Sequence, residues 1–516
     1  MKSCVLLAAL LWPAISGFGQ TSQRAAARFL DQATWGPTPA SVAALEKSTI
    51  SDWLSAQFAL KTSDLPDQPI LDSQGKNNTA LAPVQAAFFQ NVVSGQDQLR
   101  QRVAFALSQI FVVSQTSGVT PAYAYPPYWR IFRDYAFGNF RDVIEAVTLS
   151  PAMGRYLNTA NNNKANAAKN TAPNENYGRE LLQLFTLGLT QLNMDGTPVL
   201  DQNKNPAPTY TQVIITQMAR VLTGWTYPTA PNATPRNNNP PYFFGQMIPL
   251  AAEHDTTAKL IFGDVLIPAG GTAQSDLSAL LDALMKQPTM APFVSQQLIE
   301  HLVTSNPSPA YIQRVAQVFE NNGSGVTGDL KAVITAILTD PEARAGDDPT
   351  TAANPAYGHL REPILFAANV LRGLNGSVGA ANKINSYTAN MGEDLFRAPS
   401  VFSYFSPQFR TEKGLLGPEF QIYSTQTVAD RADAVNSILY GKLDQTTTVD
   451  LTPFVNQAGN TSNLLNYISS VFLHGSMSST LEQAATSAVN AQKTALAKAQ
   501  AALYVVLTSG EYNVIQ

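Results

Sequence analysis

Residues 174–189, with the sequence NENYGRELLQLFTLGL, are the stretch that decides the fold. Apolar side chains recur in it at helical spacing and share one face, while polar side chains collect on the other. The apolar face holds Tyr177, Leu181, Leu184, Phe185 and Leu189, and the polar face holds Glu175, Asn176, Arg179, Glu180 and Gln183. Glu175 precedes Arg179 by four residues, the favourable order for an ion pair within a helix. Because Gly188 suits a helix end, the stretch predicts one amphipathic helix.

The same apolar spacing recurs through most of the chain. Residues 96–113 give the most apolar of the predicted helices, and residues 210–222 give a second clearly amphipathic one. Thr38 followed by Pro39 predicts a capped helix start near the N-terminus. Further helices are predicted at 131–149, 277–284, 291–303, 310–320, 328–338, 363–374, 428–440 and 479–508.

Two features interrupt this helical pattern. Asp195-Gly196 lies between short apolar segments, which is typical of a β-hairpin. Residues 158–173 and 226–242 are rich in asparagine with alanine or proline and predict surface loops. No repeat of fixed period and no long low-complexity linker divides the chain. We therefore expect a mostly α, compact multi-helix domain over residues 20–516, with a small β-hairpin near residues 191–200 and long surface loops.

Composition narrows the class of protein. The chain has 516 residues, of which 45% are hydrophobic and 14% charged, and its formal net charge is −4. This balance provides no basic surface for nucleic acid and is not acidic enough to indicate disorder. No apolar run in the mature chain is long enough for a transmembrane helix.

The first residues predict export. Lys2 precedes an apolar run at residues 4–11, Pro13 ends that run, and Gly19 provides a small residue for cleavage. We therefore expect residues 1–19 to be a signal peptide and the protein to be exported, either periplasmic or extracellular. Its removal deletes Cys4, the one cysteine. The mature chain would then have no disulfide, no thiolate nucleophile and no cysteine-ligated zinc.

Several blocks on both sides of residues 174–189, together with that stretch, resemble in order a large bacterial family called domain of unknown function 1800. The matching blocks are 28–30 with 35–38, 100–103, 176–188, 210–211 with 222–225, 254–263, 293–298, 361–363, 399–401 and 502–512. They cover nearly the whole mature chain, and the blocks around Arg179-Glu180 and Thr223-Gly224-Trp225 are the most specific.

The resemblance implies a secreted bacterial protein without an assigned activity. Genes of this family often neighbour those of another exported family, domain of unknown function 1501, which looks sulfatase-like, and this implies a sulfatase-like exported partner. Many members carry two histidines in a Trp-His-x-His-Phe run after the arginine pair. The matching residues 107–111 here contain no histidine, so any metal role of that pair is absent.

Polar residues of two neighbouring predicted helices and the segment after them form the candidate site. The candidate catalytic residues are Glu175, Glu180 and His254, and the candidate binding residues are Asn176, Arg179, Arg220, Trp225, Asp255 and Lys259. Carboxylates with a histidine can perform general acid–base catalysis, and arginines can hold an anionic group. Two alternatives remain open: Glu175 and Arg179 form an exposed helix pair worth a few tenths of a kcal/mol, or Arg179, Glu180 and Arg220 form a buried structural network.

The sequence predicts no cofactor and no metal centre. The four histidines (His254, His301, His359 and His474) are not at ligand spacing, and His301 fits a structural role on a helix face. Asp201-x-Asn203-x-Asn205 resembles the start of a calcium loop. Pro206 replaces the glycine that such a loop needs, and turn chemistry explains these residues equally well. Calcium binding at Asp195 and Asp201 stays open.

Two functions follow as hypotheses, and the sequence leaves open whether the protein is an enzyme. The favoured one is a binding or assembly protein of the cell envelope that works with a sulfatase-like exported partner. The alternative is a hydrolase that acts on an envelope or extracellular polymer with a Glu/Arg/His cluster. An enzyme requires a pocket where a carboxylate and a histidine converge with shifted pKa values, whereas a partner protein requires an exposed apolar patch.

Overall fold

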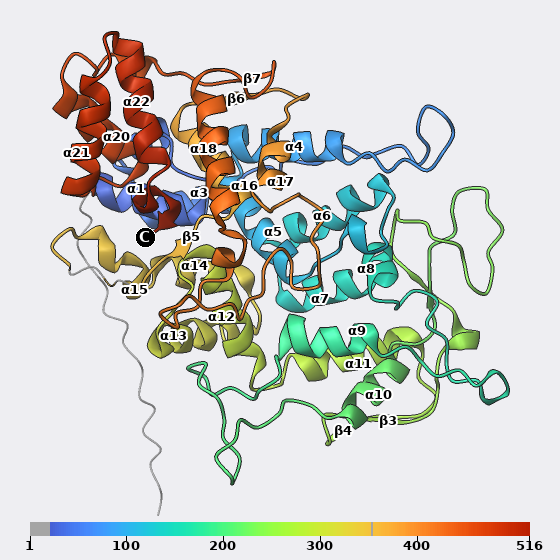
Figure 1. Ribbon diagram of the computed structural model, residues 1–516. Coiled ribbons are helices and arrows are strands. Elements are labelled where there is room, and N and C mark those ends of the chain that lie inside the picture. Colours follow the sequence, from blue (N-terminus) through green and yellow to red (C-terminus); the bar gives the residue numbers. More distant parts are fainter. Residues whose placement is uncertain (1–20, 352–353, 355) are drawn as a thin grey trace, which may run out of the picture.

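Helices dominate the molecule, which confirms the predicted mostly α fold (Figure 1). The computed structural model describes residues 21–351, 354 and 356–516, so the predicted signal peptide lies outside the described residues. The first eight helices are α1 (Gln23–Ala33), α2 (Pro39–Leu45), α3 (Ile50–Ala59), α4 (Ala82–Ser94), α5 (Gln98–Ile110), α6 (Tyr125–Tyr135), α7 (Phe140–Thr148) and α8 (Pro151–Tyr156). As predicted, Thr38 caps α2 with Pro39 at its first position, and Ser41 completes a capping box.

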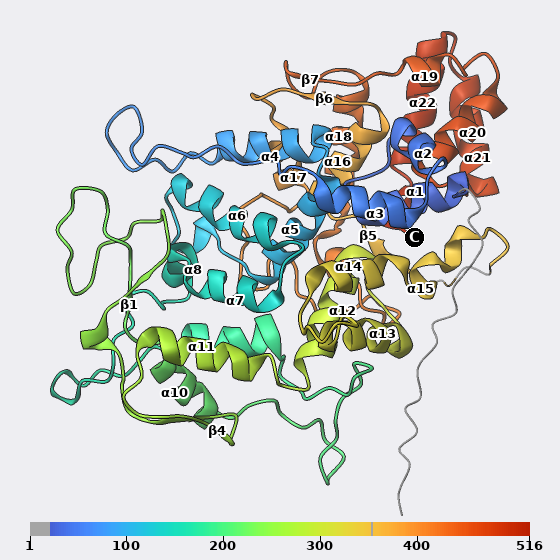
Figure 2. The ribbon, with the colours of Figure 1, turned by 180° about the vertical axis from the view of Figure 1, so that it is seen from behind.

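The middle of the chain supplies two further groups of helices. The first group is α9 (Asn176–Glu180), the π-helical turn η4 (Leu181–Thr186), α10 (Gln212–Val221) and α11 (Ala273–Leu284), and the second is α12 (Met290–Leu302), α13 (Pro309–Glu320), α14 (Leu330–Thr339) and α15 (Pro341–Arg344). The first group and strands β3 and β4 lie at one end of the molecule, with α11 below α7 (Figure 2).

The last helices pack against the first ones. They are α16 (Pro363–Gly373), α17 (Ile384–Asn390), α18 (Thr425–Leu439), α19 (Thr452–Val455), α20 (Thr461–Phe472), α21 (Ser479–Asn490), α22 (Ala495–Leu507) and α23 (Gly510–Asn513). The predicted helix 479–508 is two helices, because Thr494 caps a new start at α22. Both ribbon views place α20–α22 beside α1, and the C-terminus lies close to α1 and β5 (Figures 1 and 2).

Strands in the described residues occur only as short antiparallel pairs. The pairs are β1 (Trp225–Thr226) with β2 (Ile248–Pro249), β3 (Lys259–Ile261) with β4 (Val265–Ile267), β5 (His359–Leu360) with β8 (Val514–Ile515), and β6 (Ser377–Val378) with β7 (Thr447–Thr448). The β5–β8 pair joins residues near the C-terminus to the middle of the chain. No helix among the described residues has both the length and the apolar character to cross a membrane.

The stretch 174–189 differs from the single α-helix that its sequence predicts. The α-helix begins at Asn176 and changes to a π-helical turn at Leu181. In that turn the N–H of Leu187 donates to the carbonyl of Leu182, five residues earlier, at 2.9 Å, and the Thr186 hydroxyl donates to the carbonyl of Leu181 at 2.6 Å. A threonine hydroxyl that occupies a backbone carbonyl favours such widening of the helix, and π turns are frequent at functional sites.

The hairpin near residues 191–200 is present as a ladder of isolated bridges that extends to residue 208. Leu192 pairs with Pro198, Leu200 with Pro206 and Thr190 with Pro208. The prolines lack the N–H groups that a continuous ladder needs. The segment therefore projects from the lower edge of the molecule as a double turn without an extended strand (Figure 1).

A cluster of buried polar residues ties α1 to the C-terminal residues; we call Asp31, Arg361, Asn369, His474 and Tyr512 the Asp31 cluster. Asp31 forms an ion pair with Arg361 and lies 3.0 Å from His474 Nε2, and it accepts a 2.7 Å hydrogen bond from Asn369. The Tyr512 hydroxyl donates to Asn369 at 2.7 Å. Burial would raise the pKa of Asp31, but Arg361 and His474 outweigh it and hold that pKa below its usual range.

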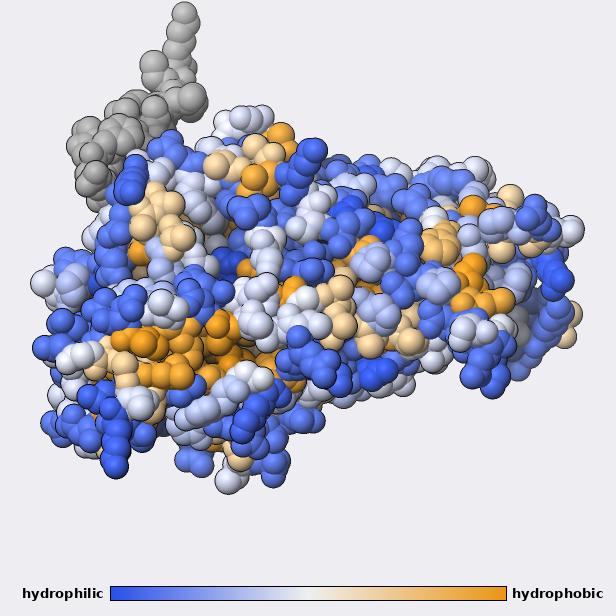
Figure 3. Space-filling view, turned by 90° about the horizontal axis from the view of Figure 1, so that it is seen from above, coloured by the Kyte–Doolittle hydropathy of each residue, from blue (hydrophilic) through white to orange (hydrophobic). Residues whose placement is uncertain are grey.

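Most of the surface seen from above is hydrophilic (Figure 3). Apolar residues gather in a band on the side where the C-terminal helices lie. Separately from this view, Tyr440 after α18 and Leu496 and Tyr504 on α22 are exposed large side chains, and we call these three residues the apolar band. Exposed apolar groups of this kind can mark a protein contact.

Candidate functional site

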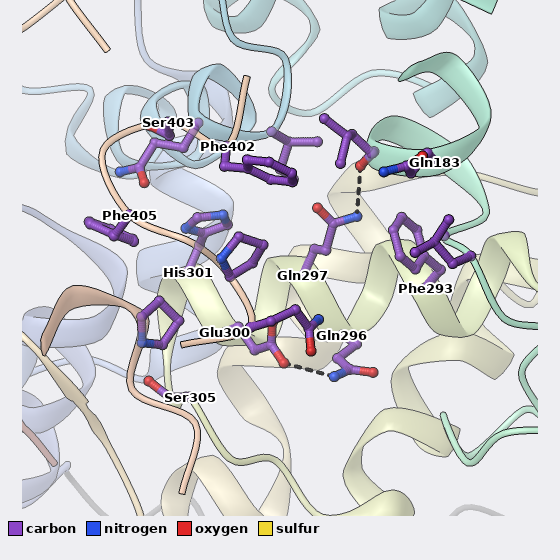
Figure 4. A pocket seen from close by; sticks show the side chains of 18 of the residues that line it. Gln183, Phe293, Gln296, Gln297, Glu300, His301, Ser305, Phe402, Ser403 and Phe405 are labelled. Carbon is purple, nitrogen blue, oxygen red and sulfur yellow. Dashed lines mark hydrogen bonds between the residues drawn. The ribbon is translucent and has the colours of Figure 1, made fainter. Parts of the chain in front are cut away.

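A cavity of about 550 Å³ lies between α12, the π turn and the irregular segment 401–419 (Figure 4). Besides aliphatic, proline and hydroxyl side chains, three groups line it: amides (Gln109, Gln183, Gln296, Gln297, Gln408), phenyl rings (Phe293, Phe402, Phe405) and ionisable groups (Glu300, His301, Glu419). Leu189 and Phe402 also line it and are 61% and 44% exposed, so its mouth reaches the surface. A cavity of this size holds a small organic ligand or the end of a polymer chain.

Helix α12 forms one wall because its polar residues follow helical spacing. Phe293, Gln296, Gln297 and Glu300 lie three and four residues apart and therefore share a face, and His301 follows on the same side. Gln296 donates to Glu300 Oε1 at 2.8 Å, and Gln297 donates to the carbonyl of Leu184 at 3.4 Å (Figure 4). These two bonds orient the amides around the carboxyl group of Glu300.

The π turn forms the second wall and brings Gln183, Leu184 and Gly188 to the cavity. Gly188 has a φ of +73°, and a Cβ there would lie 2.6 Å from Cε2 of Phe293. Only glycine fits this position, because both the backbone angle and the close approach exclude a side chain. The wide turn and Gly188 thus set how near the chain approaches the Phe293 ring.

The third wall is irregular chain held at several points. Ser403 lines the cavity with a φ of +65°, an uncommon angle for a residue other than glycine. Asn306, just beyond α12, donates to the carbonyl of Leu416 at 2.9 Å and accepts from its N–H at 3.0 Å. Strained backbone that the surroundings hold in place is common at functional sites.

Burial shifts the pKa values of both Glu300 and His301, in opposite directions. Burial, with the nearby charge of Glu419, raises the pKa of Glu300 to about 7 against the opposing hydrogen bond from Gln296. Burial, with the nearby charge of Arg102, lowers the pKa of His301 to about 3. Near neutral pH, Glu300 therefore exchanges its proton readily, and His301 is neutral.

Two further carboxyl groups lie beneath the cavity. Gln109 donates to Glu362 Oε2 at 2.7 Å, and the N–H of Ile364 donates to Glu393 Oε2 at 2.7 Å. Burial, followed by the charge of Glu362, raises the pKa of Glu393 well above its usual range. Burial also raises the pKa of Glu362, although Arg102 opposes it. The two carboxyls behave as a pair that retains a proton. We call Glu300, His301, Glu362, Glu393 and Glu419 the Glu300 cluster.

The cavity also contains buried acceptors without a donor. Gln109 Oε1 and Glu419 Oε2 have no hydrogen-bond partner among the described residues, and neither has the Ser305 hydroxyl. All three side chains line the cavity and are more than nine-tenths buried. The other carboxylate oxygen of Glu419 lies 3.3 Å from His359 Nδ1. Because unpaired buried acceptors are costly, this wall is suited to a ligand that donates hydrogen bonds.

The candidate residues from the sequence lie outside this cavity, in two groups that share α10. Glu175 and Arg179 form an ion pair at 3.0 Å, and Gln212 and Thr216 of α10 donate to Glu175 at 2.8 and 2.9 Å. Asn176 is exposed at the start of α9. Glu180 is half-buried, and burial raises its pKa against the effect of Arg179.

The second group is a buried network around His254. Its ring lies 3.2 Å from Asp276 Oδ2 through Nε2 and 2.9 Å from the carbonyl of Thr223 through Nδ1. Lys259 donates to the same Asp276 oxygen at 2.6 Å, and Arg220 pairs with Asp255 at 2.8 Å. Both ring nitrogens of His254 thus have partners within the fold.

Packing explains the Thr-Gly-Trp block that precedes this network. Gly224 has a φ of +78°, and a Cβ there would lie 2.7 Å from the Cβ of His254, so that only glycine fits. Trp225 is buried directly after it. The structure thus joins Arg220, Trp225, His254, Asp255 and Lys259 in one region. Among the described residues, no hydrogen bond or ion pair joins Glu180 to this region, although α9 and α10 are in contact, and the roles of these residues in function stay predictions.

Sequence reasoning missed Glu300 and His301. A signal was present: Gln296, Gln297, Glu300 and His301 give a predicted buried helix a polar face. The sequence predicts a structural role for His301. The structure places its side chain on the cavity wall.

The oxygen-rich segment around Asp201 forms a turn. Asp201 Oδ1 accepts from the N–H groups of Asn203 and Asn205 at 2.8 and 2.9 Å, the pattern of an Asx turn. Across the described residues, no three His, Cys, Asp or Glu side chains lie close enough together to hold a metal ion. The absence of a metal centre stays a prediction.

Comparison with known proteins identifies one family. The model of the family described as "Protein of unknown function (DUF1800)" matches residues 28–514, nearly the whole chain. No curated protein and no solved structure matches it.

Proposed function

Since the chain belongs to the DUF1800 family of proteins of unknown function, we propose a function from the cavity: an exported acid–base enzyme of the hydrolase class, with Glu300 as its proton donor and acceptor. The protein acts outside the cytoplasm, as the signal-like sequence at residues 1–19 indicates. Its substrate is a small unit or chain end of an envelope or extracellular polymer, in keeping with the size of the cavity.

One observation carries the proposal: Glu300, with a pKa of about 7, lies on the wall of the cavity next to His301. A general acid–base group is most effective when its pKa is near the working pH. Perturbed carboxyl groups in a cleft are also typical of active sites. The phenyl rings and amides of the other walls supply the apolar surface and the polar contacts that orient a ligand.

The chain's own residues allow a simple division of roles. Glu300 in its ionised form accepts a proton from the attacking water and then, in its neutral form, donates that proton to the leaving group. Gln296 holds the Glu300 carboxyl in position through the 2.8 Å hydrogen bond. His301 is neutral, so it can accept a hydrogen bond without adding positive charge near the reacting atoms.

The test is a screen of chromogenic aryl glycosides, aryl esters and aminoacyl anilides with the full mature protein and Glu300→Gln. Glu482→Gln, at an exposed position on α21, is the matched control. We expect one class to be hydrolysed with a pH dependence centred near 7, and we expect Glu300→Gln to lose at least about a hundredfold in kcat/KM. Equal activity of Glu300→Gln, or no turnover of any class, would contradict the proposal.

A second candidate is a partner-binding role, and the apolar band favours it. Tyr440, Leu496 and Tyr504 are exposed near the C-terminal helices, and patches of this kind occur at protein interfaces. The family resemblance implies a sulfatase-like exported partner. A pull-down from envelope and culture fractions tests it with Tyr504→Glu and Leu496→Glu, and Gln483→Glu serves as the control. Retention of the same partner by all variants would exclude the band as its binding surface.

A further inference from the structure

The walls of the cavity carry more acid than base. Glu300 and Glu419 line it, and no lysine or arginine does so within the described part of the chain. Glu362 and Glu393 lie beneath it, linked through Gln109. The buried cations Arg102 and Arg431 act on Glu362 and Glu393 and are fewer than the four acids. An anionic ligand such as a sulfate or a carboxylate would therefore meet repulsion.

Hydrogen-bond acceptors are also in excess on these walls. Gln109 Oε1 and Glu419 Oε2 are buried, line the cavity and have no donor among the described residues. Gln296 already donates to Glu300, and Gln297 already donates to Leu184. A ligand must then supply donors, and an ammonium group supplies three together with a positive charge.

Phenyl rings line the same cavity and accommodate the rest of such a ligand. Phe293 comes from α12, and Phe402 and Phe405 come from the irregular wall (Figure 4). Aromatic rings attract cations through their faces and also cover apolar or ring-shaped groups.

We propose that the ligand of this cavity carries a protonated amine joined to an apolar or ring-shaped body, with the ammonium group at Glu300 and Glu419 and the body against Phe293, Phe402 and Phe405. This rests on the proposed function, because it names the substrate class of the same cavity. Binding of the ammonium favours the ionised form of Glu300, so affinity rises with pH through the range in which Glu300 loses its proton. Gln296, His301 and Glu419 line the cavity beside Glu300, and the charges of Arg102 and His359 act on His301.

Matched pairs that differ only in the amine test the proposal by calorimetry on the full mature protein. The pairs are benzylamine with benzyl alcohol, glucosamine with glucose, and blocked lysine with blocked norleucine. They distinguish an arylmethyl amine, an amino sugar and a peptide side chain as the source of the amine. We expect the amine of at least one pair to bind at least about tenfold more tightly than its neutral partner at about pH 8. At about pH 7, we expect its binding to release protons when measured in two buffers of different ionisation enthalpy.

Substitutions at Glu300 and Glu419 test whether these residues cause the preference for the amine. Glu300→Gln is expected to abolish the preference for the amine and the proton release while leaving the neutral partner bound, and Glu419→Gln serves as a second variant. Glu482→Gln is the control and is expected to behave as the wild type. Equal binding of amine and alcohol, or tighter binding of benzoate, would overturn the amine proposal and leave the cavity as a ligand site. Binding of no member of any pair would overturn both proposals.

Discussion

The Asp31 cluster and the Glu300 cluster are both buried and acidic, yet they are built in opposite ways. Asp31 meets Arg361, His474 and Asn369, so its negative charge is fully compensated and its pKa falls. Glu300 has no cation paired with it in the described part of the chain: burial, with the charge of Glu419, raises its pKa to about 7 against the hydrogen bond from Gln296. The first arrangement keeps Asp31 ionised in the folded protein. The second lets Glu300 hold or release a proton near neutral pH.

This difference separates structural from chemical use of buried acids. A compensated ion pair fixes geometry, and removal of one partner is costly because the other remains buried and charged. Uncompensated carboxyls destabilise the fold when they ionise, and proteins retain such groups where function requires them. The Glu300 cluster also borders a cavity, whereas the Asp31 cluster holds α1 against residues near the C-terminus.

The largest expected change in stability comes from a substitution that breaks the Asp31 cluster. Asp31→Asn removes the charge that compensates Arg361 and leaves the donors of Arg361 and His474 facing an amide. We expect the free energy of unfolding to fall by about 3–5 kcal/mol at neutral pH, measured by chemical denaturation. Asp433→Asn, at an exposed position on α18, is the control. A loss below about 1 kcal/mol would show that the cluster is not the buried ion pair described here.

Glu300→Gln is expected to change stability in the opposite direction. The pKa of Glu300 is raised to about 7 in the folded state, so as pH rises from about 4.5 to 7 the unfolded state loses its proton first and wild-type stability declines. Glu300→Gln has no ionisable group at this position, so its stability should not fall with pH for this reason. We expect it to be more stable than the wild type by up to about 3 kcal/mol above pH 7 and equal to it below about pH 4.5. Denaturation at both pH values measures this, and a variant less stable at high pH would refute the contrast between the clusters.

Glu393→Gln sharpens the comparison with a smaller effect. The amide can still accept from Ile364, and its NH₂ offers Glu362 the donor that a shared proton otherwise supplies. We expect a change within about 1 kcal/mol at neutral pH, because a neutral isostere replaces a group that is already protonated. A thermal unfolding series from acid to alkaline pH would measure it. A large loss at neutral pH would mean that Glu393 is ionised and compensated, as Asp31 is.

Arg179→Ala is expected to have the smallest effect. Its pair with Glu175 is partly exposed and lies within one helix, so its loss costs a few tenths of a kcal/mol. Ligand binding in the cavity should be unchanged. Loss of binding or of activity with unchanged melting would place the Glu175–Arg179 region in the functional site after all.

Local patterns in the sequence predicted the helices, because periodicity and capping act within a few residues. They predicted Thr38 as a cap and Asp195-Gly196 as a turn. The π turn could not be predicted, because it depends on Thr186 bonding to Leu181 within a packed environment. The cavity could not be predicted either. Gln183, Glu300 and Phe402 come from three separate parts of the chain, and the pKa of Glu300 depends on burial that only the tertiary structure creates.

The Asp31 cluster also determines the order in which some contacts can form while the chain is synthesised. Its members span residues 31 to 512, and Arg361 bonds to the backbone of Tyr512. The ion pair of Asp31 can form once residue 361 has left the ribosome, but the cluster closes only when residue 512 follows. Contacts between such distant residues form late, because the chain between them must first be ordered. A nascent chain therefore lacks this closure until synthesis is nearly complete, and until then α1 and the last helices are not joined through Asn369 and Tyr512.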